Sequence, residues 1–160
     1  MPSPYLLEEN DPYSFEFVTD QRIRYSVYFL DYSSMFAAYP GIASQTYMFN
    51  LDVIKGNPVE GISDERIGVT VLKVFSLFFL NRQNVAVYVC DSLDSRQLAR
   101  KRKFDIWFWK YNDGSLLKED DIAVIEGAEI YNSMILHKEN KQLTEIILAF
   151  KELNEKANNK

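Results

Sequence analysis

The sequence has almost none of the residues that bind metals or act as catalytic nucleophiles. Its 160 residues include one cysteine, Cys90, and one histidine, His137. A lone cysteine cannot form a disulfide within the chain, which suits a reducing, cytoplasmic location. Zinc and iron sites need clustered ligands, so we expect no metal site. A Cys–His dyad would require the fold to bring these two residues together, although a single cysteine in a strand is more often a small core residue.

We also expect no phosphate-binding loop, signal peptide or membrane span. Neither GxxxxGK[ST] nor GxGxxG occurs, so no loop of that type predicts nucleotide binding. The formal net charge of −5 argues against nucleic acid as a partner, because a non-specific binder needs a basic surface. The N-terminus has no basic segment followed by an apolar one, and the longest apolar window, residues 69–80, is too short for a membrane span. We therefore expect a cytoplasmic protein that does not associate with membranes.

Aromatic residues are abundant: ten tyrosines, eleven phenylalanines and two tryptophans. Because each buries a large area, they predict an aromatic core, an adhesive surface, or both. The length fits a single domain over residues 1–160. We expect its ordered core to extend from about residue 13 to 153, with frayed termini.

Hydrophobic periodicity predicts an α+β fold. Alternating residues indicate three antiparallel strands at 13–19, 23–29 and 47–54, and the third is followed by a helix that Ser63 caps and that ends near Leu80. A short apolar strand at 85–90 precedes a helix at 94–110, two strands at 121–125 and 130–138, and a last helix at 141–156. The expected architecture is an N-terminal antiparallel β-meander followed by α-β-α-β-β-α, in one mixed sheet with helices packed on it.

The helix predicted at 94–110 has an arginine among its apolar positions. On a helical wheel, Arg100 falls within the apolar face, and Arg96 lies at its edge with Lys103. That face comprises Leu93, Phe104, Trp107, Phe108 and Tyr111. A buried, unpaired charge is too costly, so Arg100 should pair with a carboxylate, a stacking aromatic or a bound anion. Asp91 and Asp94, in the loop before the helix, are the nearest candidates.

Two interpretations of this cluster remain open. The charges could form an internal ion-pair cluster that joins helix to sheet, or they could bind an anionic ligand or an acidic motif of a protein partner. The second interpretation rests on position, because open α/β sheets place ligands where a strand leads into a helix. Trp109 points away from the packed face, where it is either covered or part of a contact patch. The tentative binding residues are Asp91, Asp94, Arg96, Arg100, Trp107 and Trp109. The sequence identifies no catalytic residue and no oligomeric state.

Three segments carry a resemblance to a family of small proteins of unknown function found mainly in Bacteroidetes. They are DERIGVTVLKVFSLFF, VYVCDSLDSRQLARKRKFDIWF and IYNSMILHKENKQLTEIILAF. The resemblance extends from about Tyr13 to Leu153 and implies a bacterial protein with a single domain. It implies no activity.

The order of elements is also similar to that of GNAT-type N-acyltransferases. In those enzymes a glycine-rich turn at a helix N-terminus holds the pyrophosphate of acyl-CoA. The matching segment here, GNPVEGISDERIG, places Asp64 and Glu65 where phosphates would bind and offers only Gly61 and Gly68. We therefore expect a non-enzymatic binding or regulatory module with no cofactor. The alternative is a GNAT-like N-acyltransferase with a degenerate acyl-CoA loop, for which acetyl-CoA would be the cofactor.

Overall fold

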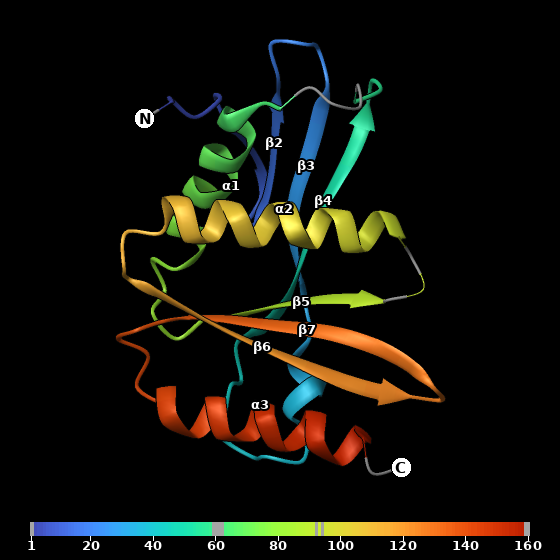
Figure 1. Cartoon of the computed structure of the whole chain (residues 1–160). Coiled ribbons are helices and arrows are strands. Elements are labelled where there is room, and N and C mark those ends of the chain that lie inside the picture. The colour runs from blue at the N-terminus through green and yellow to red at the C-terminus, as the bar shows by residue number, and fades with distance from the viewer. Residues whose placement is uncertain (1, 59–62, 92, 94, 159–160) are drawn as a thin grey trace.

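One mixed sheet of seven strands organises the part of the chain that this computed structural model describes, residues 2–58, 63–91, 93 and 95–158 (Figure 1). The strands lie in the order β1-β2-β3-β4-β5-β7-β6. They are β1 (Glu8–Asp11), β2 (Ser14–Val18), β3 (Arg24–Asp31), β4 (Thr46–Lys55), β5 (Val85–Asp91), β6 (Leu116–Ile125) and β7 (Ala128–His137). The helices are α1 (Glu65–Phe78), α2 (Ser95–Tyr111) and α3 (Leu143–Asn158), with a 3₁₀ helix, η1, at Ser33–Phe36. The predicted α+β class is confirmed, and the elements follow in the predicted order after one further strand, β1, that was not predicted.

The sheet changes character between β4 and β5. Strands β1 to β4 form an antiparallel meander, and β5, β7 and β6 form a second antiparallel set. The two sets meet through one parallel pairing, in which only Thr46–Met48 of β4 face Val85–Val87 of β5. Beyond those three pairs the strands diverge, so that in Figure 1 β2, β3 and β4 run up the view while β5, β7 and β6 cross it.

Helices cover the sheet on both faces. Helices α1 and α2 pack on one face over an aromatic core, in which Phe29, Phe49, Phe75, Phe78 and Phe104 contact one another. The other face holds a smaller aliphatic core beneath η1 and α3. Helix α1 is buried along most of its length, as predicted, because α2 lies on one side of it and the N-terminal residues on another. None of the described helices is long and apolar enough to cross a membrane.

Three boundaries differ from the prediction. Asp64 rather than Ser63 caps α1, and its side chain accepts a hydrogen bond from the backbone N–H of Arg66. Strand β6 begins at Leu116 rather than near residue 121, because the charged residues of its first half conceal the alternation. The ordered region also starts before residue 13, since β1 precedes it and Tyr5 is buried against Phe17.

Candidate functional site

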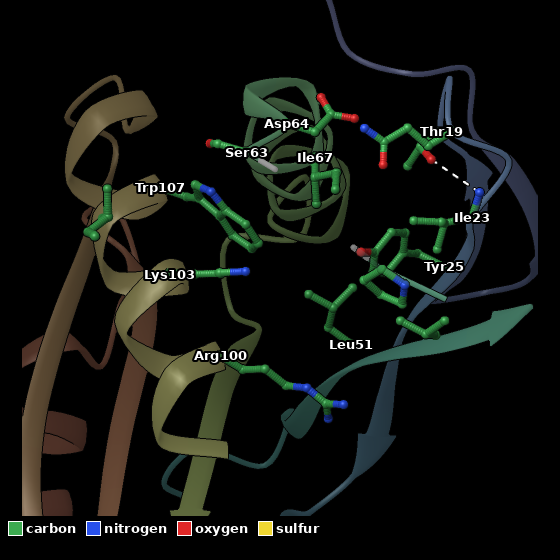
Figure 2. A pocket seen from close by; sticks show the side chains of 14 residues that line it. Thr19, Ile23, Tyr25, Leu51, Ser63, Asp64, Ile67, Arg100, Lys103 and Trp107 are labelled. Atoms are coloured by element: carbon green, nitrogen blue, oxygen red, sulfur yellow. Dashed lines mark hydrogen bonds between the residues drawn. The ribbon is translucent and has the colours of Figure 1, made fainter. Parts of the chain in front are cut away.

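The divergence of β4 from β5 opens a pocket of about 520 Å³ on the α1 and α2 face of the sheet (Figure 2). It is lined by Thr19, Gln21, Ile23, Tyr25, Leu51, Val53, Pro58, Ser63, Asp64, Ile67, Arg100, Lys103, Ile106 and Trp107. The walls therefore come from the β2–β3 turn, the second half of β4, the N-terminal end of α1 and the middle of α2. Its volume lies within the range of sites for small molecules, and it borders the carboxyl half of β4, the part of that strand beyond its parallel pairing with β5.

Helix α2 contributes Phe104 to the core and lines the pocket with residues on either side of it. Phe104 packs between Phe49 of β4 and Tyr88 of β5, with ring centroids 5.3 and 5.6 Å apart, and so fills the point where the strands separate. Arg100 and Trp107 lie about one turn before and after it on the same side of the helix. The same helical face is therefore core at Phe104 and pocket wall at Arg100.

Two cations project into the pocket from α2. Figure 2 shows the side chains of Arg100 and Lys103 extending from the helix toward β4. Both residues are exposed, and among the described residues neither forms an ion pair. Opposite them lie apolar and aromatic surfaces of Tyr25, Leu51 and Ile67. The pocket thus combines unpaired positive charge with an apolar wall.

The carboxylate in the described pocket lining, Asp64, is already engaged. Its Oδ1 accepts a hydrogen bond from the Arg66 backbone N–H at 2.9 Å, and its Oδ2 accepts one from the Tyr5 hydroxyl. Burial and this contact with Asp64 raise the pKa of Tyr5 to about 12. Burial, with the nearby charge of Asp64, also raises the pKa of Tyr25, which Arg100 partly opposes. Both phenols therefore stay protonated at neutral pH, and with Arg100 and Lys103 the lining carries a formal charge of +1.

The structure separates the six predicted binding residues. Arg100 and Trp107 line the pocket, Trp107 by packing over Gly68 of α1. Trp109 lies 76% exposed away from the pocket, and Arg96 is exposed on the first turn of α2. Asp94 lies outside the described residues, as does the side chain of Asp91 at the end of β5. The predicted burial of Arg100 in the helix face is wrong, because that half of α2 overhangs the pocket instead of the core.

Other charges join α2 to the sheet. Lys118 of β6, whose side chain is 1% exposed, lies 2.8 Å from the carboxylate of Asp105 and 2.6 Å from that of Asp120. Lys101, one turn before Asp105, pairs with it at 2.7 Å. A buried lysine between two carboxylates is the arrangement that makes an internal charge tolerable. The cluster of Lys101, Asp105, Lys118 and Asp120 therefore connects this helix to the sheet.

Cys90 and His137 cannot form a dyad. Cys90 of β5 faces Tyr131 of β7, six residues before His137, so the two side chains are separated by roughly 20 Å along the strand. His137 is buried, and burial together with neighbouring Arg82 lowers its pKa. Its Nδ1 accepts a hydrogen bond from the Glu139 backbone N–H. The geometry gives it a structural role.

Sequence reasoning missed the part of the pocket that the meander supplies. Tyr25 and Leu51 were assigned to strands from their alternation, but nothing local indicated that β4 would leave its neighbour after three residues. Lys103, which the wheel placed at the edge of the apolar face, was not named as a binding residue, although it lies one turn after Arg100 and four residues before Trp107. That spacing predicts a shared helix face.

No curated protein shows significant sequence similarity to the chain. Among solved structures, that of a CoA-dependent acyl-homoserine lactone synthase, MesI, aligns with a TM-score of 0.37 and 10% sequence identity, over 90% of this chain and 70% of that one. A likeness of that size supports no conclusion about ligand or activity.

A family profile matches a narrower segment than the resemblance from about Tyr13 to Leu153. It covers residues 63–152, from the residue before the cap of α1 into the last helix, and so includes both helices that wall the pocket. These 90 residues are more than half of the 160 in the sequence. The chain therefore belongs to this family, which is described as a family of unknown function (DUF6169).

Proposed function

We propose that the protein is a ligand-binding module whose pocket takes a small molecule with an anionic group and an apolar body. The observation that carries this proposal is the pair of cations, Arg100 and Lys103, directed into a pocket that is otherwise largely apolar. A carboxylate or phosphate would supply a negative charge opposite these two cations, and its hydrogen bonds to them would be charge-assisted. The aromatic and aliphatic wall would hold the rest of the ligand through burial.

A binding role fits the lining better than catalysis does. General acid–base chemistry needs a titrating group within reach of the substrate. The lining offers Asp64, which already accepts two hydrogen bonds, and Tyr25, whose pKa is raised. Tyr25 therefore stays protonated at neutral pH, and both carboxylate oxygens of Asp64 are occupied by hydrogen bonds within the protein.

Acyl-CoA is a second candidate ligand, and the divergence of β4 from β5 favours it. Beyond Met48, the edge of β4 that faces β5 has no strand partner in the described register, so its backbone amides could bond to an extended chain. The N-terminus of α1 fits the pyrophosphate poorly, because Asp64 caps it and Glu65 occupies its first turn. Arg100 and Lys103 are the residues that would meet the phosphates.

Thermal unfolding with chosen ligands tests the proposal. The probes are decanoate, phenyl phosphate, AMP and acetyl-CoA, each at millimolar concentration. A ligand present at 100 times its dissociation constant adds about 2.7 kcal/mol to the free energy of unfolding, which for this chain length is a rise of roughly 5–10 °C in Tm. At least one probe should give such a rise, and a rise with acetyl-CoA alone would select the second candidate.

The matched variants come from the same helix. The Arg100→Ala/Lys103→Ala double variant should lose the ligand-induced rise, whereas Arg102→Ala, an exposed arginine outside the pocket lining, should keep it. The proposal fails if no probe raises Tm, or if the double variant responds as the parent protein does.

A further inference from the structure

Two large apolar side chains are exposed to solvent on the side of α2 that faces away from the sheet. Ile106 is 62% exposed and Trp109 is 76% exposed. Arg102 and Lys110 are exposed beside them, and we call these four residues the α2 outer face. Helix α2 crosses the front of the sheet in Figure 1, and no other described helix or strand covers it. Ile106 and Trp109 are one helical turn apart, so they form a contiguous apolar strip.

The charge of α2 is opposite to that of the rest of the molecule. The helix contains six lysines and arginines and one aspartate, a formal charge of +5. Because the whole chain carries −5, the remaining residues carry −10. Lys110 pairs with Glu65, but Arg102 and Lys103 form no ion pair within the described part of the chain. Lys101 is paired as well, with Asp105 and Asp120, so the positive charge of α2 that has no ion pair among the described residues includes Arg102 and Lys103.

We propose that the α2 outer face docks an acidic segment of another protein, with Trp109 and Ile106 receiving an apolar side chain of that segment. Tryptophan and arginine are the residues that most often dominate the energy of protein interfaces, and a neighbouring apolar residue excludes water around them. Complementary charge raises the rate of encounter and fixes the orientation of the partner. The face adjoins the pocket at Ile106 but is distinct from it at Arg102, Trp109 and Lys110.

Charge selects this occupant over the two obvious others. A symmetric contact with a second copy would bring two α2 helices together, each with a charge of +5, and like charges opposed across an interface cost free energy. Nucleic acid would meet the charge of −10 on the rest of the molecule once it extended past the helix. An acidic protein segment of about the length of α2 would pair with the cations of this helix. It would avoid both the repulsion between two α2 helices and the repulsion between nucleic acid and the acidic remainder of the molecule.

A fluorescein-labelled peptide of 16 residues, with glutamates on one helical face and leucine at every third or fourth position, is the probe. Its fluorescence anisotropy should report binding at least tenfold tighter than that of the same peptide with every glutamate replaced by glutamine. Raising the salt concentration from 0.05 to 0.5 M should weaken binding, because exposed charges are screened. The Trp109→Ala and Arg102→Glu variants should each lose about tenfold in affinity, the loss expected of an interface hot spot.

Matched variants separate this face from the rest of the surface and from the pocket. Leu148→Ala removes a leucine of α3 that is also 62% exposed, and Lys151→Glu reverses an exposed charge on the same helix, which packs on the opposite face of the sheet. Both should bind the peptide as the parent protein does, as should Arg100→Ala. Equal binding of the glutamine peptide, unchanged binding by Trp109→Ala, or tighter binding of a 16-nucleotide single strand would each overturn the proposal.

Discussion

Arg100 and Phe104 lie one turn apart on α2 and meet different surroundings. Phe104 is 1% exposed between β4 and β5, whereas Arg100 is exposed at the pocket. Truncation of Phe104 to alanine should cost about 3–5 kcal/mol in the free energy of unfolding, as for other buried aromatics. Arg100→Ala should change it by no more than about 0.5 kcal/mol, because the substitution removes an exposed side chain that forms no ion pair with the described residues.

Urea unfolding of the two variants measures this contrast directly. A loss of more than 2 kcal/mol in Arg100→Ala would show that its charge is paired inside the protein after all. Lys103→Ala is a suitable companion variant, since it is exposed on the same wall and should also be nearly neutral.

Helix α2 shows what a helical wheel can and cannot predict. The wheel assumes one environment along each face, and it placed Phe104, Trp107 and Phe108 correctly on the side that packs. It failed for Arg100, because the first half of the helix extends beyond the core, and for Leu93, which is 80% exposed and precedes the first residue of α2. That difference depends on where β4 and β5 separate, which is a contact between segments distant in the sequence.

The contact between α1 and α2 depends on the absence of a side chain at Gly68. A Cβ there would overlap the indole of Trp107, lying 2.6 Å from its Cγ. Alanine is the better helix former by about 1 kcal/mol, but overpacking costs about 1–3 kcal/mol. We therefore expect Gly68→Ala to lower the free energy of unfolding and to change the fluorescence of Trp107.

A double-mutant cycle isolates the cause. In a Trp107→Ala background the clash is absent, so Gly68→Ala should now stabilise the protein by about 1 kcal/mol through helix propensity alone. If the substitution has the same effect in both backgrounds, the close approach of the two helices does not account for the glycine.

At the scale of the molecule, the strand order was the feature that local patterns could not supply. Alternation placed most strands and periodicity placed all three helices, because each signal is carried by neighbouring residues. The insertion of β7 between β5 and β6, and the three-residue pairing of β4 with β5, arise from contacts across the chain. The pocket depends on both contacts. For this reason the wall formed by the β-meander was not predicted, whereas the wall formed by α2 was predicted in part.

The pH dependence of stability follows from groups at the other end of the molecule. Burial and nearby Arg82 hold the pKa of His137 below its usual value, so the folded state favours the neutral ring. The unfolded chain, with a histidine pKa of about 6.5, then binds the proton first as the pH falls. The stability that His137 contributes is complete above that pH and is lost progressively below it.

Stability also depends on pH in a second, more acidic range, in which carboxylates become protonated. Burial raises the pKa of Asp120, but hydrogen bonds from Lys118 and Ser133 outweigh it and lower the value overall. This contribution is present above the unfolded carboxyl pKa of about 4 and is lost only below it.

Urea midpoints at pH 7.5, 5.5 and 3.5 and constant ionic strength should therefore fall in two steps. His137→Asn, whose amide oxygen can still accept from the Glu139 N–H, should remove the first step and keep the second. An unchanged fall between pH 7.5 and 5.5 in that variant would assign the first step to another group.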